Sequence, residues 1–140
     1  MFESVPALQH WLERCLTQLD AVAGTIHLVQ DQSLRLVAAC NIPPPVLAAV
    51  ASVPSGKGMA GLALQRCQPV TTCNLQTDTS GDVRPGARAV AAQAAIAQPV
   101  LDASQQVRAV LGVAWAAAGD PDPQQQAAVV QQAQQLLTLL

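Results

Sequence analysis

The most constraining feature of this sequence is a pair of apolar segments, residues 94–101 and 107–116, separated by the mainly polar residues 102–106. Short apolar runs joined by a polar turn are typical of a β-hairpin. Within the second run, successive side chains point to opposite faces of a sheet, because a strand repeats every two residues. Both faces are apolar, so we expect a central strand of an antiparallel sheet that is covered on both sides.

The two faces of this strand differ in the size of their side chains. One face carries Val110, Gly112, Ala114 and Ala116, and the other carries Leu111, Val113 and Trp115. A face of small residues admits a closely packed helix or leaves room for a ligand. Close helix packing is the commoner reason, and the sequence does not decide between the two.

The other segments predict an α+β fold in which helices flank the hairpin and its neighbouring strands. Helical spacing predicts a first helix over residues 5–19 with Ser4 as its N-cap. Asp122, Pro123 and Gln125 predict a capping box at the start of the last helix. The remaining expected elements are strands over 24–29, 34–40 and 68–72, short helices over 43–51 and 59–66, a turn over 53–58 and a polar loop over 74–86. Residues 1–140 are expected to form a single domain.

Composition and charge exclude several classes of function. The formal net charge is −2 and 11% of the residues are charged, and no basic run indicates nucleic-acid binding. The longest uncharged apolar stretch, residues 109–118, is about half of what is needed to cross a membrane. The beginning of the chain has no pattern of a signal peptide. We therefore expect a cytoplasmic protein whose four cysteines are mainly reduced.

Four segments together resemble one known family. They are Val53-Pro54-Ser55-Gly56-Lys57-Gly58-Met59-Ala60-Gly61, Gln68-Pro69-Val70, Ala95-Ile96-Ala97-Gln98-Pro99-Val100 and Val110-Leu111-Gly112-Val113-Ala114. In this order they resemble GAF domains, which are sensor modules related to PAS domains. The resemblance implies an antiparallel sheet of five or six strands with the terminal helices on one face. It also implies a ligand pocket on the other face, under residues 42–92, and dimers formed through the terminal helices.

The enzymatic and pigment-binding branches of that family match this chain poorly. Free methionine-(R)-sulfoxide reductases carry one cysteine at the position of Ala60 and another in the loop that corresponds to residues 80–92, and both are missing here. The Cys-His dipeptide of bilin-attaching photoreceptors and the Asn-Lys-Phe-Asp-Glu constellation of cyclic-nucleotide phosphodiesterases are missing too. The resemblance therefore implies the scaffold without these activities, and we expect no enzyme.

The residues that we expect to line the ligand site belong to the turn, the polar loop and one strand. They are His27, Lys57, Met59, Cys73, Asn74 and Arg84. A glycine-rich turn before a helix presents free N–H groups to an anion, and Lys57 adds a positive charge. The simpler interpretation is that Gly56, Gly58 and Gly61 provide backbone freedom and close contact. His27 has the strand parity of an inward-facing residue, either a ligand of haem or iron or a buried histidine with hydrogen bonds.

The cysteines allow a second interpretation based on thiol chemistry. Cys67 and Cys73 lack the spacing of a zinc pair, so we expect no metal site. Cys40 and Cys73 each end a predicted strand and could meet as a redox pair near the pocket. Buried, inert thiols are the commoner alternative, and Cys15 falls on the apolar face of the first helix.

The leading hypothesis is a sensory module that binds a small molecule, with an acidic ligand as one candidate. A homodimer through residues 5–19 and 124–140, or another protein in trans, would carry the output. The sequence requires no cofactor and identifies none. Two alternatives stay open: a thiol-based redox sensor or reductase that uses Cys40, Cys67 or Cys73, and a structural dimerisation module without a ligand.

Overall fold

A computed structural model describes residues 3–74, 76 and 92–140 of the chain. One antiparallel sheet of six strands, in the order β3-β2-β1-β6-β5-β4, organises the structure. The helices are α1 (Pro6–Gln18), α2 (Pro44–Val50), α3 (Gly58–Arg66) and α4 (Pro123–Leu137). The strands are β1 (Ala23–Gln30), β2 (Ser33–Cys40), β3 (Ser52–Pro54), β4 (Val70–Thr72), β5 (Ala94–Leu101) and β6 (Val107–Trp115). The α+β class, the terminal helices and the sheet are confirmed.

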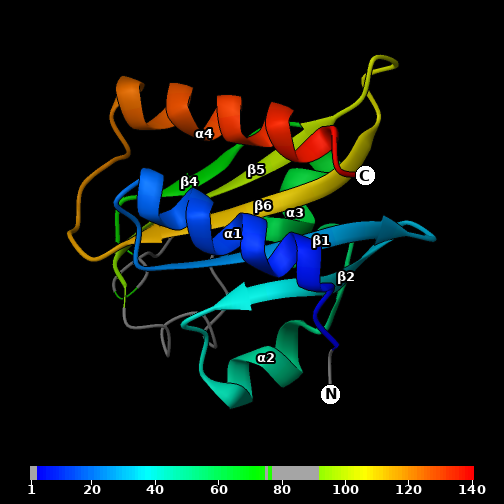
Figure 1. Cartoon of the computed structure of the whole chain (residues 1–140), viewed down its shortest axis with the longest axis horizontal. Helices are drawn as coiled ribbons and strands as arrows, with labels where there is room; N and C mark the ends of the chain where they lie inside the picture. The colour runs from blue at the N-terminus through cyan, green and yellow to red at the C-terminus, as the bar shows by residue number, and fades with distance from the viewer. Residues whose placement is uncertain (1–2, 75, 77–91) are drawn as a thin grey trace.

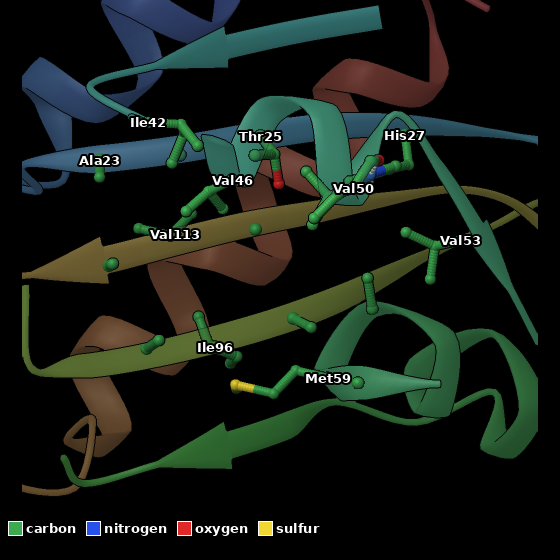
Figure 2. Close-up of a pocket in the computed structure, with 18 of the residues that line it drawn as sticks. Ala23, Thr25, His27, Ile42, Val46, Val50, Val53, Met59, Ile96 and Val113 are labelled. Carbon is green, nitrogen blue, oxygen red and sulfur yellow. Dashed lines mark hydrogen bonds between the residues drawn. The ribbon is translucent and has the colours of Figure 1, made fainter. Parts of the chain in front are cut away.

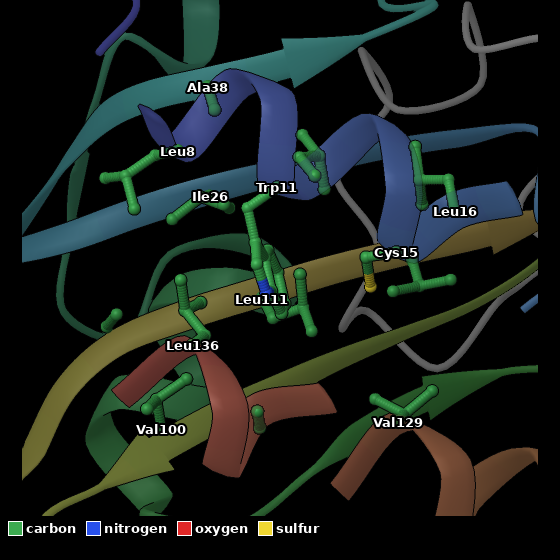
Figure 3. Close-up of a cluster of buried hydrophobic side chains, with 14 of the residues drawn as sticks. Leu8, Trp11, Cys15, Leu16, Ile26, Ala38, Val100, Leu111, Val129 and Leu136 are labelled. Carbon is green, nitrogen blue, oxygen red and sulfur yellow. The ribbon is translucent and has the colours of Figure 1, made fainter. Parts of the chain in front are cut away.

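The terminal helices α1 and α4 lie side by side across one face of the sheet, which we call the packed face (Figure 1). The larger side chains of β6 point into this layer, and two of them, Leu111 and Val113, are almost fully buried against the helices. Leu111 belongs to the same buried cluster as Trp11 of α1 and Leu136 of α4, and Figure 3 shows it between the two helices. Burial of these large side chains supplies much of the hydrophobic stabilisation of the domain.

The opposite face of the sheet, which we call the cavity face, is covered by shorter elements. Helix α3 lies behind the sheet in the view of Figure 1, and α2 lies near the edge formed by β2. Three hydrogen bonds join α2 and the residues that flank it to the first two strands and to the residue before β1. Asn41 Nδ2 donates to Val22 O at 2.7 Å, the N–H of Leu36 donates to Ala51 O at 3.0 Å, and His27 Nε2 is 2.9 Å from Val50 O. In α2 only Val46 is buried, so this helix, which we call the roof, is attached to the sheet mainly at its two ends.

The part of β2 that β3 does not cover is closed by the first helix. The side chain of Gln9 donates from Nε2 to Ala39 O at 2.8 Å and accepts at Oε1 from the N–H of Ala39 at 3.0 Å. The N–H of Val5 donates to Val37 O at 2.8 Å. These bonds satisfy edge groups that would otherwise be free to pair with another strand.

The structure corrects two local predictions and confirms a third. Helix α1 has Val5 as its N-cap, without a side-chain cap, so the prediction of Ser4 was wrong. The turn predicted over 53–58 begins with strand β3, which pairs with β2 because Val53 lies opposite Leu34 in the core. The capping box of Asp122 and Gln125 is confirmed. Most of the predicted loop over 74–86 lies outside the described residues. Among the helices that the structure describes, none is long and apolar enough to cross a membrane.

Candidate functional site

A cavity of about 280 Å³ lies between the cavity face of the sheet and the short elements that cover it. This volume equals that of about nine water molecules in the liquid. Strands β1, β6 and β5 form the floor, and α2, β3 and the start of α3 form the opposite walls (Figure 2). The described residues that line it are Ala23, Gly24, Thr25, His27, Ile42, Val46, Ala49, Val50, Val53, Lys57, Gly58, Met59, Ala60, Ala95, Ile96, Ala97, Gly112, Val113 and Ala114.

The cavity exists because the strands place small residues on this side of the sheet. Ala95 and Ala97 of β5 pair directly with Ala114 and Gly112 of β6, and side chains of paired residues point to the same face. None of these four residues reaches far from the floor. The sequence allowed either a closely packed helix or a ligand over the small residues of β6. In the structure, Gly112 and Ala114 of this strand line the cavity.

Thr25 supplies a polar atom to this floor. It pairs with Gly112, and a Cβ atom built on Gly112 would lie 2.6 Å from Thr25 Oγ1. Figure 2 shows the oxygen of Thr25 on the cavity side of β1. The absence of a side chain at Gly112 thus leaves the hydroxyl uncovered.

His27 is 2% exposed and joins the floor to the roof through its contact with Val50 O. Because a carbonyl oxygen only accepts, this bond requires a proton on Nε2 and leaves Nδ1 as an acceptor. Nδ1 has no partner within the described part of the chain. Burial lowers the pKa of His27, and the bond to Val50 partly opposes this shift. The neutral ring is therefore favoured.

The wall opposite His27 is the start of helix α3. Lys57 is its N-cap and makes no side-chain cap. The three glycines of this turn have clear structural reasons: Gly56 and Gly58 have φ of 86° and 65°, and a Cβ on Gly61 would lie 2.5 Å from Pro54 O. These reasons are sufficient by themselves and do not require an anion.

The structure brings three of the six expected site residues to the cavity. His27, Lys57 and Met59 line it, and Figure 2 shows the side chain of Met59 extending into the space from α3. Cys73 is exposed and Asn74 is half-buried, with Nδ2 3.4 Å from Gln93 Oε1, and neither is among the lining residues. Arg84 lies outside the described residues, as does Arg88.

Sequence analysis missed most of the lining. The floor alanines and Thr25 carry the same strand parity as Gly112 and His27, so parity alone was a usable signal for them. The roof residues Val46 and Val50 had no such signal, because their position depends on how α2 folds back over the sheet.

The cysteines lie away from the cavity, and the four are free thiols. Cys40 and Cys73 do not meet, because β2 and β4 are separated by β1, β6 and β5 in the sheet. Cys40 faces α1, where its Sγ is 3.5 Å from Gln9 Nε2. Burial, with a smaller contribution from Glu13, raises the pKa of Cys40. Burial also raises the pKa of Cys15 to about 12, and Cys67 and Cys73 are exposed.

Within the described ranges, no group of three or more His, Cys, Asp or Glu side chains is arranged to hold a metal ion. His27 is the only one of these four residue types among the residues that line the cavity there.

Solved structures with this fold include GAF domains and free methionine-R-sulfoxide reductases. The chain is similar to the GAF domain of a phosphoenolpyruvate-protein phosphotransferase from Acinetobacter, with 20% identity, 93% of this chain and 77% of that chain covered, and a TM-score of 0.73. The corresponding domain from Coxiella burnetii is 17% identical, with 95% of this chain and 79% of that chain covered and a TM-score of 0.78. A type II free methionine-R-sulfoxide reductase from Thermoplasma acidophilum is 12% identical, with 96% of this chain and 89% of that chain covered and a TM-score of 0.78.

At such identities these similarities concern the fold alone. A comparison with curated protein sequences found no match. The family model of the GAF domain matches residues 7–140, which is nearly the whole chain. The protein therefore belongs to the GAF domain family.

Proposed function

We propose that this protein is a sensory module that binds a small molecule in the cavity and passes the resulting change to a partner. The observation that carries the proposal is the cavity itself: about 280 Å³ of space over a floor of small residues. Apolar walls with a few polar groups, here Thr25, His27 and Lys57, are typical of ligand sites.

The roof is the element that a ligand would affect most directly. It is attached to the sheet at its ends by Asn41, His27 and Leu36, and Val46 and Val50 line the cavity between these points. A ligand in contact with Val46 and Val50 would favour the closed position of α2. Such a shift is limited to the difference between the affinities of the ligand for the closed and open states.

Thermal unfolding in the presence of a broad panel of small molecules tests this function. A ligand at 100 times its dissociation constant adds about 2.7 kcal/mol to the free energy of unfolding. Ala114→Leu extends a side chain into the cavity and is expected to abolish the stabilisation by any hit. Ala103→Leu, at an exposed position in the β5–β6 turn, is the matched control and should leave it unchanged. A panel without any stabiliser would favour a structural module.

We further propose that the terminal helices form a homodimer. Their outer surface carries few charges, and Val5 and Val130 are 37% and 39% exposed. Sedimentation over a range of concentrations should show a dimer that dissociates in Val130→Asp. Ala103→Asp, at an exposed position in the β5–β6 turn outside both terminal helices, is a control for added charge. A wild-type protein that is monomeric at every concentration contradicts this arrangement.

A redox function through exposed thiols is the second candidate, supported by the exposure of Cys67 and Cys73. Its test is the change in ligand binding and in sedimentation after mild oxidation, in the wild type and in Cys67→Ser and Cys73→Ser. We expect no change, since neither thiol lines the cavity in the described part of the chain. A response that is lost in one of these variants would favour the redox function.

A further inference from the structure

One end of the roof is held to the sheet by a titratable side chain. At the C-terminal end of α2, Val50 O is 2.9 Å from His27 Nε2, and Ala51 O accepts from the N–H of Leu36 at 3.0 Å. His27 and Leu36 are partners in the pairing of β1 with β2, so these two bonds break together when this end of the roof leaves the sheet. The bond at the other end is donated by the amide of Asn41, which does not titrate.

The ring of His27 fits the closed roof in one protonation state. Nε2 carries the proton that Val50 O accepts, whereas Nδ1 is buried and has no partner in the described part of the chain. A proton on Nδ1 would strengthen the bond to Val50 O. It would also create a buried cation whose second N–H has no acceptor, which is costly. Burial is the larger influence and lowers the pKa of His27, so the closed roof favours the neutral ring.

The side chains around the ring do not compensate for a charge on it. Those contributed by the neighbouring strands and by the roof are apolar: Leu36 of β2, Val110 of β6, Val53 of β3 and Val50 of α2. From the start of α3, Lys57 lines the same cavity and has the same charge as a protonated imidazole. None of these side chains can accept a hydrogen bond from Nδ1.

We infer that the bond between His27 and Val50 is a proton-sensitive latch, which holds the roof closed over the cavity while the imidazole is neutral and releases this end of the roof when the ring is protonated. Val46 and Val50 line the cavity from the roof, so release uncovers an apolar wall and opens a way out for a bound molecule. An exposed imidazole has a pKa near 6.5, so opening increases as the pH falls below this value. The consequence for a ligand rests on the proposed function.

Hydrogen exchange of single amides, measured by NMR, tests the latch. Protection factors compare each amide with an unfolded peptide at the same pH, so the pH dependence of the exchange chemistry cancels. The N–H of Leu36 is the reporter, because its acceptor, Ala51 O, leaves with the roof. Between pH 7.5 and 5 its protection should fall by about three- to thirtyfold, since opening increases at most about tenfold per pH unit below 6.5.

The N–H of Ala39 is the matched control amide. It lies on the same strand as Leu36 but donates to Gln9 Oε1 of α1 at 3.0 Å, so its local opening does not free His27. Its protection should change less than about twofold over the same range. Equal changes at Leu36 and Ala39 in the wild type overturn the latch, as does a Leu36 protection equal to that of Leu111 in the middle of the sheet, which would mean that only unfolding of the whole domain exposes Leu36.

Two variants assign the pH dependence to His27. His27→Gln keeps a donor for Val50 O without a titration, so the protection of Leu36 should stay constant within about twofold. His10→Gln, at an exposed position, should keep the wild-type change. A fall of wild-type size in His27→Gln overturns the latch, and if this variant does not fold, the comparison of Leu36 with Ala39 in the wild type still decides.

Toluene, which has no charge at any pH, tests whether the latch controls the cavity. Its binding should be lost in Ala114→Leu, which fills the floor. In the wild type, the rate at which toluene leaves, measured by NMR line shapes, should rise from pH 7.5 to 5 by the factor by which Leu36 loses protection, and it should stay constant in His27→Gln. An unchanged rate in the wild type overturns control of the cavity by the roof. If neither toluene nor any other molecule of the panel binds, the proposed function fails, whereas the exchange of Leu36 still decides the latch.

Discussion

The two faces of the sheet are built from the same strands but differ in the size of their side chains and in what covers them. On the packed face, Leu111 of β6 is fully buried between α1 and α4. On the cavity face, Gly112 and Ala114 of the same strand lie under an open space. Because strand parity separates these positions, side chains on one face can be selected for stability and those on the other for binding. A small domain can therefore keep a cavity on one face of its sheet while large side chains pack against helices on the other.

Truncation of a large side chain on each face should reveal the largest contrast. Leu111→Ala is expected to lower the free energy of unfolding by about 2–5 kcal/mol, because it removes buried carbons and leaves a void. Met59→Ala should cost only about 1 kcal/mol, since its half-buried side chain already borders empty space. Urea denaturation with a constant m-value measures both. Equal losses would mean that the cavity face contributes as much to stability as the packed face.

Addition of a methyl group to adjacent glycines should give the next contrast. A Cβ on Gly24 would lie 2.8 Å from both Gly112 O and Leu16 Cδ2, on the packed face. Gly24→Ala should therefore cost about 1–3 kcal/mol. In Gly112→Ala the only close atom is Thr25 Oγ1, because the next atoms are at 3.8 Å. The hydroxyl can rotate toward the cavity, so we expect a cost below about 1 kcal/mol. A larger loss for Gly112→Ala would indicate that the floor is rigid.

The packed face was predictable from the sequence to a large extent. The parity of residues 107–116, the helical spacing of residues 5–19 and the capping signal at Asp122 all depend on neighbours along the chain. Strand β3 was missed because its three residues are defined by pairing with β2. Ser4 was chosen by residue type, whereas the helix begins after Val5, whose N–H bonds to Val37 in β2.

The cavity was predictable in its location and less in its composition. Lys57 and Met59 belong to a local motif, and His27 to a strand whose parity is readable. The roof of α2 depends on a long-range bond between His27 and Val50, 23 residues apart. A pattern of neighbouring residues cannot predict a contact between two residues that are so far apart in the sequence. Cys73 was placed near the cavity by its position at a strand end, but it follows an edge strand of the sheet, β4, and its side chain is exposed.

The titration of His27 should make the cavity face sensitive to pH. Its pKa in the folded protein is lowered from 6.5 by burial. Below about pH 6.5 the unfolded chain binds a proton that the folded protein does not bind, so stability falls as the pH decreases toward the lower folded pKa. The contribution is fully present above pH 6.5, and its slope is at most about 1.4 kcal/mol per pH unit.

Unfolding between pH 7.5 and 5 in two variants checks this contribution. His27→Gln keeps a donor for Val50 O and should lose this part of the pH dependence. His10→Gln is the matched control, because the His10 side chain is 80% exposed, and it should keep the wild-type slope. An unchanged slope in His27→Gln would show that the pH dependence comes from other groups.

The smallest expected effect concerns an imperfection in the packed face. Gln98 of β5 is 7% exposed and pairs with Leu111. Its Oε1 has no partner among the described residues, and its Nε2 is 3.4 Å from Pro99 O. Gln98→Met keeps the length of the side chain and removes the buried polar group, so we expect a gain of about 0.5–1 kcal/mol in unfolding free energy.

Gln132→Met is the matched control, because Gln132 is also buried but donates from Nε2 to Gln18 Oε1 at 2.7 Å. Loss of that bond should lower stability, since it leaves the acceptor of Gln18 without its partner. Opposite signs in the two variants would show that hydrogen bonding, and not polarity as such, decides which buried glutamines the packed face tolerates. A loss of stability in Gln98→Met would instead mean that a buried water satisfies Oε1. The packed face would then contain a small polar site of its own, and the contrast between the two faces would be one of degree.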